Sequence, residues 1–365
     1  MRGGGVESVF PALGPSFVVA GHGGVPMASN SGADVRKHAT AIADLIADYR
    51  RGEVEKPTPE HVTNWLDQLE EDERTKARFL AELHHVLSQT YVSRPTAVGF
   101  LKGLVKSNKL AGKDPCGFWK RSHILSIQKG GASQADLREI FGEVLDEACS
   151  LDIDECTAEA GPFIYLDDAV FTGMRVVNDV RDWLAYTPKE VSFHVVAMAV
   201  YSAGDFNLRA QIAELAREAK KRVDVTVWSQ RFFVNHSNQG AASDVLRLRS
   251  FPRDEASKLY IEEHGDPRSP QLLRPENERN TSKLFSNEES RDLLERVFWK
   301  AGLKVRDLCQ HLKTMHRPLG YTSTNSKNKL GFGSLFVSYR NCPNNCPLAL
   351  WAGDPWYPLL PRKTN

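Results

Sequence analysis

Two patterns of hydrophobic and polar positions divide the chain. Between residues 34 and 110, apolar residues recur every three or four positions, the spacing that places them on one face of a helix. We predict one helix over His38–Arg50 and a second that begins at Pro59, where Thr58 can cap the free backbone amides. This part of the chain is therefore predicted to be helical.

From residue 123 onward, strand-like apolar runs alternate with helical ones. The predicted strands cover residues 124–127, 163–166, 191–200 and 223–228, and the predicted helices between them cover residues 133–148, 176–184 and 208–221. Ser133 and Asp136 form a capping box at the start of the first of these helices. The β-α-β-α-β-α-β order is typical of an α/β domain with a largely parallel sheet.

The predicted domain organisation follows from these patterns. Residues 1–32 are rich in glycine, serine and proline without a sustained apolar period, so we expect a disordered leader. Residues 33–110 form the helical region, residues 111–251 the α/β core, and residues 252–365 an irregular C-terminal cap. Because the aromatic residues between 330 and 361 are too numerous to be left exposed to water, we expect this segment to pack over the α/β core.

The net charge and hydropathy of the chain give no indication of a nucleic-acid or membrane partner. The chain has 47 Lys and Arg against 46 Asp and Glu, so its net charge of +1 gives no global reason to expect nucleic acid or a membrane surface. No apolar run approaches the roughly 20 residues needed to cross a bilayer. We therefore expect a cytoplasmic protein with no membrane partner, and direct nucleic-acid binding is not indicated.

The six cysteines are widely spaced along the chain, unlike those of small disulfide scaffolds, and we interpret most of them as reduced packing residues. The C-terminal part holds a set of side chains of the types that bind zinc: Cys309, His311, His316, Cys342 and Cys346. Its cysteines lack the tight spacing of structural zinc ribbons, so ordinary packing is favoured over a metal site.

Candidate chemistry lies where the strand Phe163–Leu166 ends. Two adjacent carboxylates, Asp167 and Asp168, follow the strand at the sheet edge where open α/β sheets bind ligands. They can accept hydrogen bonds from a vicinal diol and attract Mg²⁺, which prefers oxygen ligands. The turn amides and the Thr172 hydroxyl precede a helix whose start can hold a phosphate. The alternative interpretation is a plain strand-end turn with solvated carboxylates.

This run resembles the phosphoribosyl pyrophosphate motif of type I phosphoribosyltransferases, in which an apolar strand, two acidic residues and a Thr-Gly phosphate loop occur in this order. The resemblance implies that Asp167 and Asp168 are the catalytic pair, holding the ribose hydroxyls and magnesium. It places the phosphate on Ala169, Val170, Phe171, Thr172, Gly173, Met174 and Arg175. Arg175 departs from the motif, which usually has Thr or Ser there; its guanidinium could hold the phosphate bidentately or signal a different ligand.

A second element of that family is a pyrophosphate-binding loop after the first core strand. Lys129, Gly130, Gly131 and Ser133 occupy the corresponding place, although such turns also occur as plain connections. The stretch between Ser133 and Phe163 leaves little room for the strands that usually intervene. The mobile hood of the family could therefore be missing or displaced.

The chain over residues 34–365 also resembles phosphoribosyltransferase-like proteins predicted as effectors of bacterial anti-phage conflict systems, some encoded beside retrons. The resemblance implies a phosphoribosyltransferase-like, mostly parallel sheet flanked by helices, and other defence-system proteins as partners. One functional hypothesis is an enzyme that uses magnesium and phosphoribosyl pyrophosphate to transfer a phosphoribosyl group, or that cleaves a nucleotide. The other is a non-catalytic regulator that senses a nucleotide.

Trp228 with Arg231 could stack on a nucleobase, and Trp228 could equally be a core residue.

Overall fold

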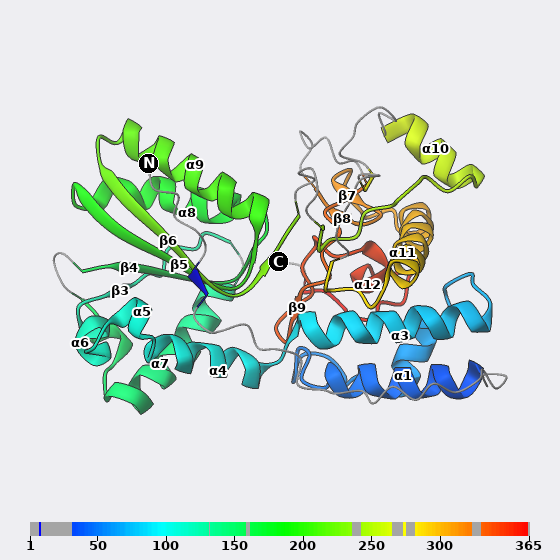
Figure 1. The fold of residues 1–365 in the computed structure, drawn as a ribbon, viewed down its shortest axis with the longest axis horizontal. Coiled ribbons are helices and arrows are strands. Elements are labelled where there is room, and N and C mark those ends of the chain that lie inside the picture. The colour runs from blue at the N-terminus through cyan, green and yellow to red at the C-terminus, as the bar shows by residue number, and fades with distance from the viewer. Residues whose placement is uncertain are drawn as a thin grey trace. The chain divides into compact units, whose positions relative to one another are not determined.

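The chain folds into two compact units (Figure 1). The computed structural model describes residues 7–8, 31–130, 132–157, 161–235, 242–264, 273–274, 282–322 and 330–363. The sheet unit comprises Met1–Gly21 and Arg94–Phe233, and the helical unit comprises His22–Ser93 and Val234–Asn365. This division differs from the predicted domains, because the first helices and the C-terminal segment belong to one unit.

The sheet unit contains a parallel sheet of five strands in the order β1-β6-β5-β4-β3. The strands are β1 (Glu7–Ser8), β3 (His123–Ile124), β4 (Phe163–Val170), β5 (Glu190–Tyr201) and β6 (Arg222–Phe233). Asp167 pairs in register with Ala197 and Ala197 with Ser229, so β4, β5 and β6 end at the same edge. The predicted α/β fold with a mostly parallel sheet is confirmed.

Helices cover both faces of this sheet (Figure 1). They are α4 (Arg94–Val105), α5 (Asn108–Ala111), α6 (Pro115–Lys120), α7 (Ser133–Cys149), α8 (Met174–Trp183) and α9 (Ser202–Glu218), with short 3-10 turns η1 (Ile153–Glu155) and η2 (Leu184–Tyr186). The helices α8 and α9 lie on one face, and α4 to α7 lie on the other. Because both faces are covered, every residue of β5 from Val195 to Tyr201 is buried.

The strand β1 falls within the segment that was predicted to be a disordered leader. Glu7 and Ser8 pair with Trp228 and Ser229 of β6, and the first helix begins at Ser31. The prediction of disorder over residues 1–32 therefore does not hold for Glu7–Ser8 or for Ser31–Gly32. The other residues before 31 lie outside the part of the chain that the structure describes.

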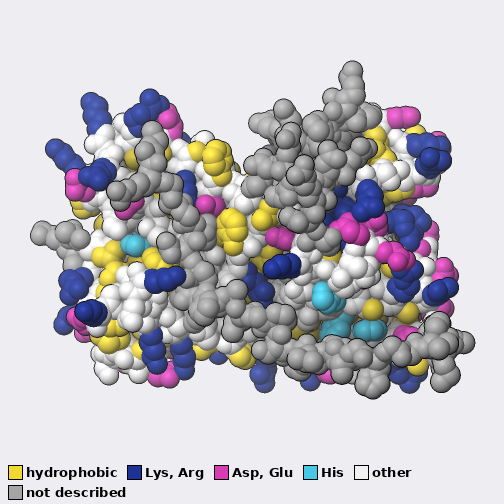
Figure 2. Space-filling model, viewed as in Figure 1, with side chains coloured by type: hydrophobic (Ala, Val, Ile, Leu, Met, Phe, Trp, Pro, Cys, Tyr) yellow, Lys and Arg dark blue, Asp and Glu magenta, His cyan; other side chains and the backbone are white. Residues whose placement is uncertain are grey.

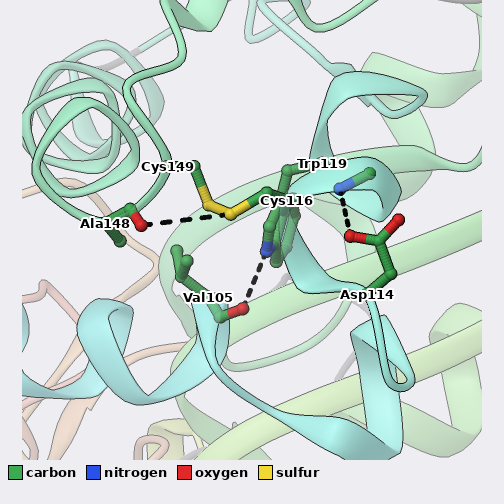
Figure 3. Close-up of a disulfide and its surroundings, with 7 residues drawn as sticks. Val105, Asp114, Cys116, Trp119, Ala148 and Cys149 are labelled. Carbon is green, nitrogen blue, oxygen red and sulfur yellow. Dashed lines mark hydrogen bonds between the residues drawn. A yellow bond between two sulfur atoms is a disulfide. The ribbon is translucent and has the colours of Figure 1, made fainter.

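A disulfide joins the start of α6 to the end of α7, through Cys116 and Cys149 (Figure 3). Beside it, the buried Trp119 indole donates a hydrogen bond of 3.0 Å to the carbonyl oxygen of Val105 in α4. The expectation that most cysteines are reduced does not extend to this pair. The four remaining cysteines, Cys156, Cys309, Cys342 and Cys346, are buried free thiols.

The helical unit is built around α1 (Ser31–Leu45), α2 (Pro59–Leu66), α3 (Glu73–Thr90), α10 (Glu255–His264), α11 (Glu288–Leu308) and α12 (Leu348–Trp351). Two short strand pairs complete it: β2 (Tyr91–Val92) with β9 (Val337–Ser338), and β7 (His316–Arg317) with β8 (Gly320–Tyr321). As predicted, Thr58 caps α2, accepting a hydrogen bond of 3.2 Å from the amide of His61. None of the described helices is long and apolar enough to cross a bilayer.

The C-terminal segment packs against the first helices of the helical unit. The Trp65 indole donates to the carbonyl oxygen of Ala349 at 2.7 Å, and the Tyr49 hydroxyl donates to that of Pro361 at 2.9 Å. Leu348, like these aromatic residues, belongs to a single buried core. This segment was predicted to pack over the α/β core; it belongs instead to the buried core of the helical unit, where apolar faces on residues 31–92 provide the complementary surface.

Candidate functional site

On the face drawn in Figure 2, the charge of the described residues does not single out a binding surface. Lys and Arg side chains of the described residues are interspersed on this face with Asp and Glu side chains. The candidate site is instead defined by geometry at the carboxyl edge of the sheet. There, β4 ends with Asp167, Asp168, Ala169 and Val170; Phe171, Thr172 and Gly173 form a turn; and Met174 and Arg175 begin α8.

The acidic pair lies at the end of β4 in two different environments. Asp167 is buried, with 3% of its surface exposed, whereas Asp168 is half-buried. Burial, followed by the charge of Asp168, raises the pKa of Asp167 to about 7. The Ser133 hydroxyl and the Arg175 guanidinium lie close enough to act in the opposite direction. The site therefore holds a carboxyl group that a nearby cation would ionise at neutral pH.

The turn after β4 depends on glycine. Gly173 has a φ of 75°, and a Cβ atom there would lie 2.6 Å from the carbonyl oxygen of Gly204. The Thr172 hydroxyl accepts a hydrogen bond of 3.4 Å from the amide of Met174, the first residue of α8. The first backbone amides of a helix have no partner within the helix and point toward its N-terminal end, which gives this turn the character of an anion site.

The start of α9 holds this turn in place, and sequence reasoning missed its contribution. A Cβ atom on Gly204 would lie 2.2 Å from the carbonyl oxygen of Phe171, so the backbones touch at that point. The Asn207 side chain donates a hydrogen bond of 2.7 Å to the carbonyl oxygen of Thr172. A signal was available, because α9 follows β5 and parallel strands end at one edge.

The predicted pyrophosphate loop lies between β3 and α7. The Gln134 side-chain oxygen accepts hydrogen bonds from the amides of Ile127 at 2.7 Å and Gln128 at 2.9 Å. The Gln128 side chain in turn donates to the Ser133 hydroxyl at 2.9 Å. Gly131 lies outside the described residues. The side chains of Ser133 and Gln134 therefore connect the start of α7 to the segment that follows β3.

The structure brings the two predicted loops together. The Arg175 guanidinium donates a hydrogen bond to the carbonyl oxygen of Gly130, and the Lys129 ammonium forms an ion pair with Asp182 of α8. The Lys129 amide donates to a carboxylate oxygen of Asp179 at 3.1 Å. Neither sequence interpretation of Arg175 anticipated its contact with the neighbouring loop. The two loops thus line one site beside the acidic pair.

The two residues considered for nucleobase stacking lie on β6. Trp228 is buried, and its indole donates a hydrogen bond of 2.9 Å to His194 Nδ1. Burial lowers the pKa of His194 to about 4, which keeps this nitrogen an acceptor at neutral pH. Of the two alternatives for Trp228, the core position is confirmed. Arg231 is half-buried, and burial lowers the pKa of its guanidinium.

Comparison with known protein families identifies a match over most of the chain. The model of the family described as PRTase-CE matches residues 62–362, which include the acidic pair, both loops and most of the helical unit. No curated protein and no solved structure matches the chain.

Proposed function

Because the chain belongs to the PRTase-CE family of phosphoribosyltransferase-like proteins, we propose that it binds phosphoribosyl pyrophosphate or a related nucleotide at the carboxyl edge of the sheet. The observation that carries this proposal is the contact between Arg175 and the carbonyl oxygen of Gly130. It joins two loops that each precede a helix, beside a pair of carboxylates. A ligand with anionic groups at both ends and a diol between them matches that arrangement.

In this proposal each part of the ligand has its own partner. Asp167 and Asp168 accept hydrogen bonds from the ribose hydroxyls, and the turn from Phe171 to Arg175 holds the 5′-phosphate. The described residues Lys129, Gly130 and Ser133 hold the pyrophosphate. Magnesium suits the acidic pair, since burial and mutual repulsion leave its negative charge undercompensated. When bound, the ion would neutralise charge on the pyrophosphate.

The reaction consistent with this arrangement is displacement at the anomeric carbon of the ribose. The bond from that carbon to the pyrophosphate oxygen breaks, the pyrophosphate leaves with the electron pair, and an acceptor base or water forms the new bond and gives up a proton. The protein supplies orientation and electrostatic stabilisation of the separating charges rather than a covalent intermediate. We propose that this activity takes place in the cytoplasm. On the strength of the family resemblance, we propose that the protein is an effector of bacterial anti-phage defence that acts with other defence proteins.

One observation favours a second candidate, a nucleotide-sensing regulator without turnover. Between β3 and β4 the described residues contain α7 and η1 and no strand, so they do not build the hood that resemblance to type I enzymes implies. A site without that cover would leave a reactive ribose accessible to water. Binding without catalysis is compatible with such a site.

A pyrophosphate release assay separates the two candidates. The protein is incubated with phosphoribosyl pyrophosphate, magnesium and each common nucleobase in turn, and with no base. Release that requires Asp167 and Asp168 supports transfer or cleavage. Saturable binding without release under any condition supports the regulator, and absence of binding contradicts both.

A further inference from the structure

Asp179 is a buried residue that contacts both the strand β4 and the loop after β3, which contribute to the candidate site. It lies in α8, with only 4% of its surface exposed, and its two carboxylate oxygens have different partners. One accepts a hydrogen bond of 2.7 Å from the hydroxyl of Tyr165, a fully buried residue of β4. The other accepts the bond of 3.1 Å from the amide of Lys129. A single buried side chain thus links the strand of the acidic pair to the first loop.

The link acts on the backbone of the loop rather than on a flexible side chain. The Lys129 amide is fixed by Asp179, and the amides of Ile127 and Gln128 are fixed by Gln134 on the other side of the turn. Because these three amides already donate to side chains, they fix the path of the loop, and this path sets the orientation of the next amide, that of Gly130, toward an anion. Hydrogen bonds to a buried carboxylate are strong and hold this orientation closely.

We propose that Asp179 is a positioning residue that sets the backbone of the Lys129–Gly130 segment for the pyrophosphate end of the ligand. Asp179 does not touch the ligand, since the protein uses both of its oxygens. This inference rests on the proposed function and deepens it, because it assigns the two ends of the ligand to separately supported loops. The turn after β4 is held instead by Gly204 and Asn207 of α9.

A merely structural Asp179 would affect both ends of the ligand equally, so binding is measured with two half-ligands. Inorganic pyrophosphate with magnesium tests the first loop, and ribose 5-phosphate tests the turn after β4. For Asp179→Ala we expect pyrophosphate to bind at least about tenfold more weakly, equivalent to about 1.4 kcal/mol, while ribose 5-phosphate is unaffected within about twofold.

Asp179→Asn should rescue pyrophosphate binding. The amide oxygen of Asn can accept from the Lys129 amide, and its NH₂ group can donate to the Tyr165 hydroxyl, which can rotate to accept. The matched control is Asp182→Asn, one turn further along α8, which removes only the exposed partner of the Lys129 side chain. That control should bind both half-ligands as the wild type does, within about twofold, because exposed ion pairs contribute little.

The outcomes separate this proposal from the proposed function. Wild-type protein that binds neither half-ligand contradicts the function and this inference with it. Wild-type binding of both, combined with equal loss or no loss in Asp179→Ala, overturns the positioning role alone. If Asp179→Ala does not fold, amide hydrogen exchange in the wild type decides: slow exchange at Lys129 supports the link, and exchange at the rate of an unstructured peptide overturns it.

Discussion

The negative charge of the buried Asp167 should lower the unfolding free energy of the protein when no ligand is bound. A substitution that removes this charge should therefore stabilise the protein. Asp167 is almost fully buried beside Asp168, and its pKa rises from 3.8 to about 7. Because the folded protein holds this proton more tightly than the unfolded chain, the contribution of Asp167 to the unfolding free energy falls as pH rises from about 4 to about 7. The rise of about three pKa units corresponds to a loss of about 4 kcal/mol above pH 7.

Asp167→Asn keeps the shape of the side chain and cannot ionise. We therefore expect the variant, without ligand, to be more stable than the wild type at pH 8 by up to about 4 kcal/mol, and similar to it at pH 4. Urea denaturation at pH 4, 6 and 8 measures the difference, and the exposed Asp224→Asn is the matched control. A variant that is less stable than the wild type at pH 8, or a gain that does not depend on pH, would refute the reasoning.

Three further predictions concern the supports of the site and the rest of the fold. Gly204→Ala should displace the carbonyl of Phe171 and weaken ribose 5-phosphate binding by about tenfold or more, with pyrophosphate binding retained in calorimetry. Cys149→Ser, or a reducing agent, should lower the unfolding free energy by about 3 to 4 kcal/mol, because the disulfide closes a loop with a sequence separation of 33; an unchanged melting temperature would count against it. Burial lowers the pKa of His38 and His84, so the contribution of these two side chains to the unfolding free energy should fall as pH drops below about 6.5; His84→Gln should lose less stability than the wild type over that drop in urea titrations.

The sequence predicted the parts of the site that follow local rules. The alternation of strands and helices located β4 and α8, and the order of acidic and Thr-Gly residues located the acidic pair and the turn between these two elements. It could not predict that Arg175 would contact Gly130, because a guanidinium reaches several partners and tertiary packing selects one. Asp179 was missed for a related reason, since a buried aspartate on a helix looks like any exposed one until its partners are known.

Local sequence patterns also did not predict how the chain divides into its two units. Helical periodicity identifies an apolar face but not the surface that covers it. The apolar face of α2 contacts the C-terminal segment, for example through Trp65 and Ala349, which are 284 positions apart. The disulfide is a similar case, because spacing among six cysteines does not determine a pairing.

The most direct test of the central claim is calorimetric titration of the protein with phosphoribosyl pyrophosphate in the presence and absence of magnesium. It is repeated with Asp167→Asn/Asp168→Asn, whose fold is checked by circular dichroism. We predict saturable, magnesium-dependent binding to the wild type, accompanied by a stability gain of about 2.7 kcal/mol at a hundredfold excess over the Kd, and loss of both in the folded double variant. Equal binding and an equal gain in both proteins, or no binding to the wild type, would contradict the account.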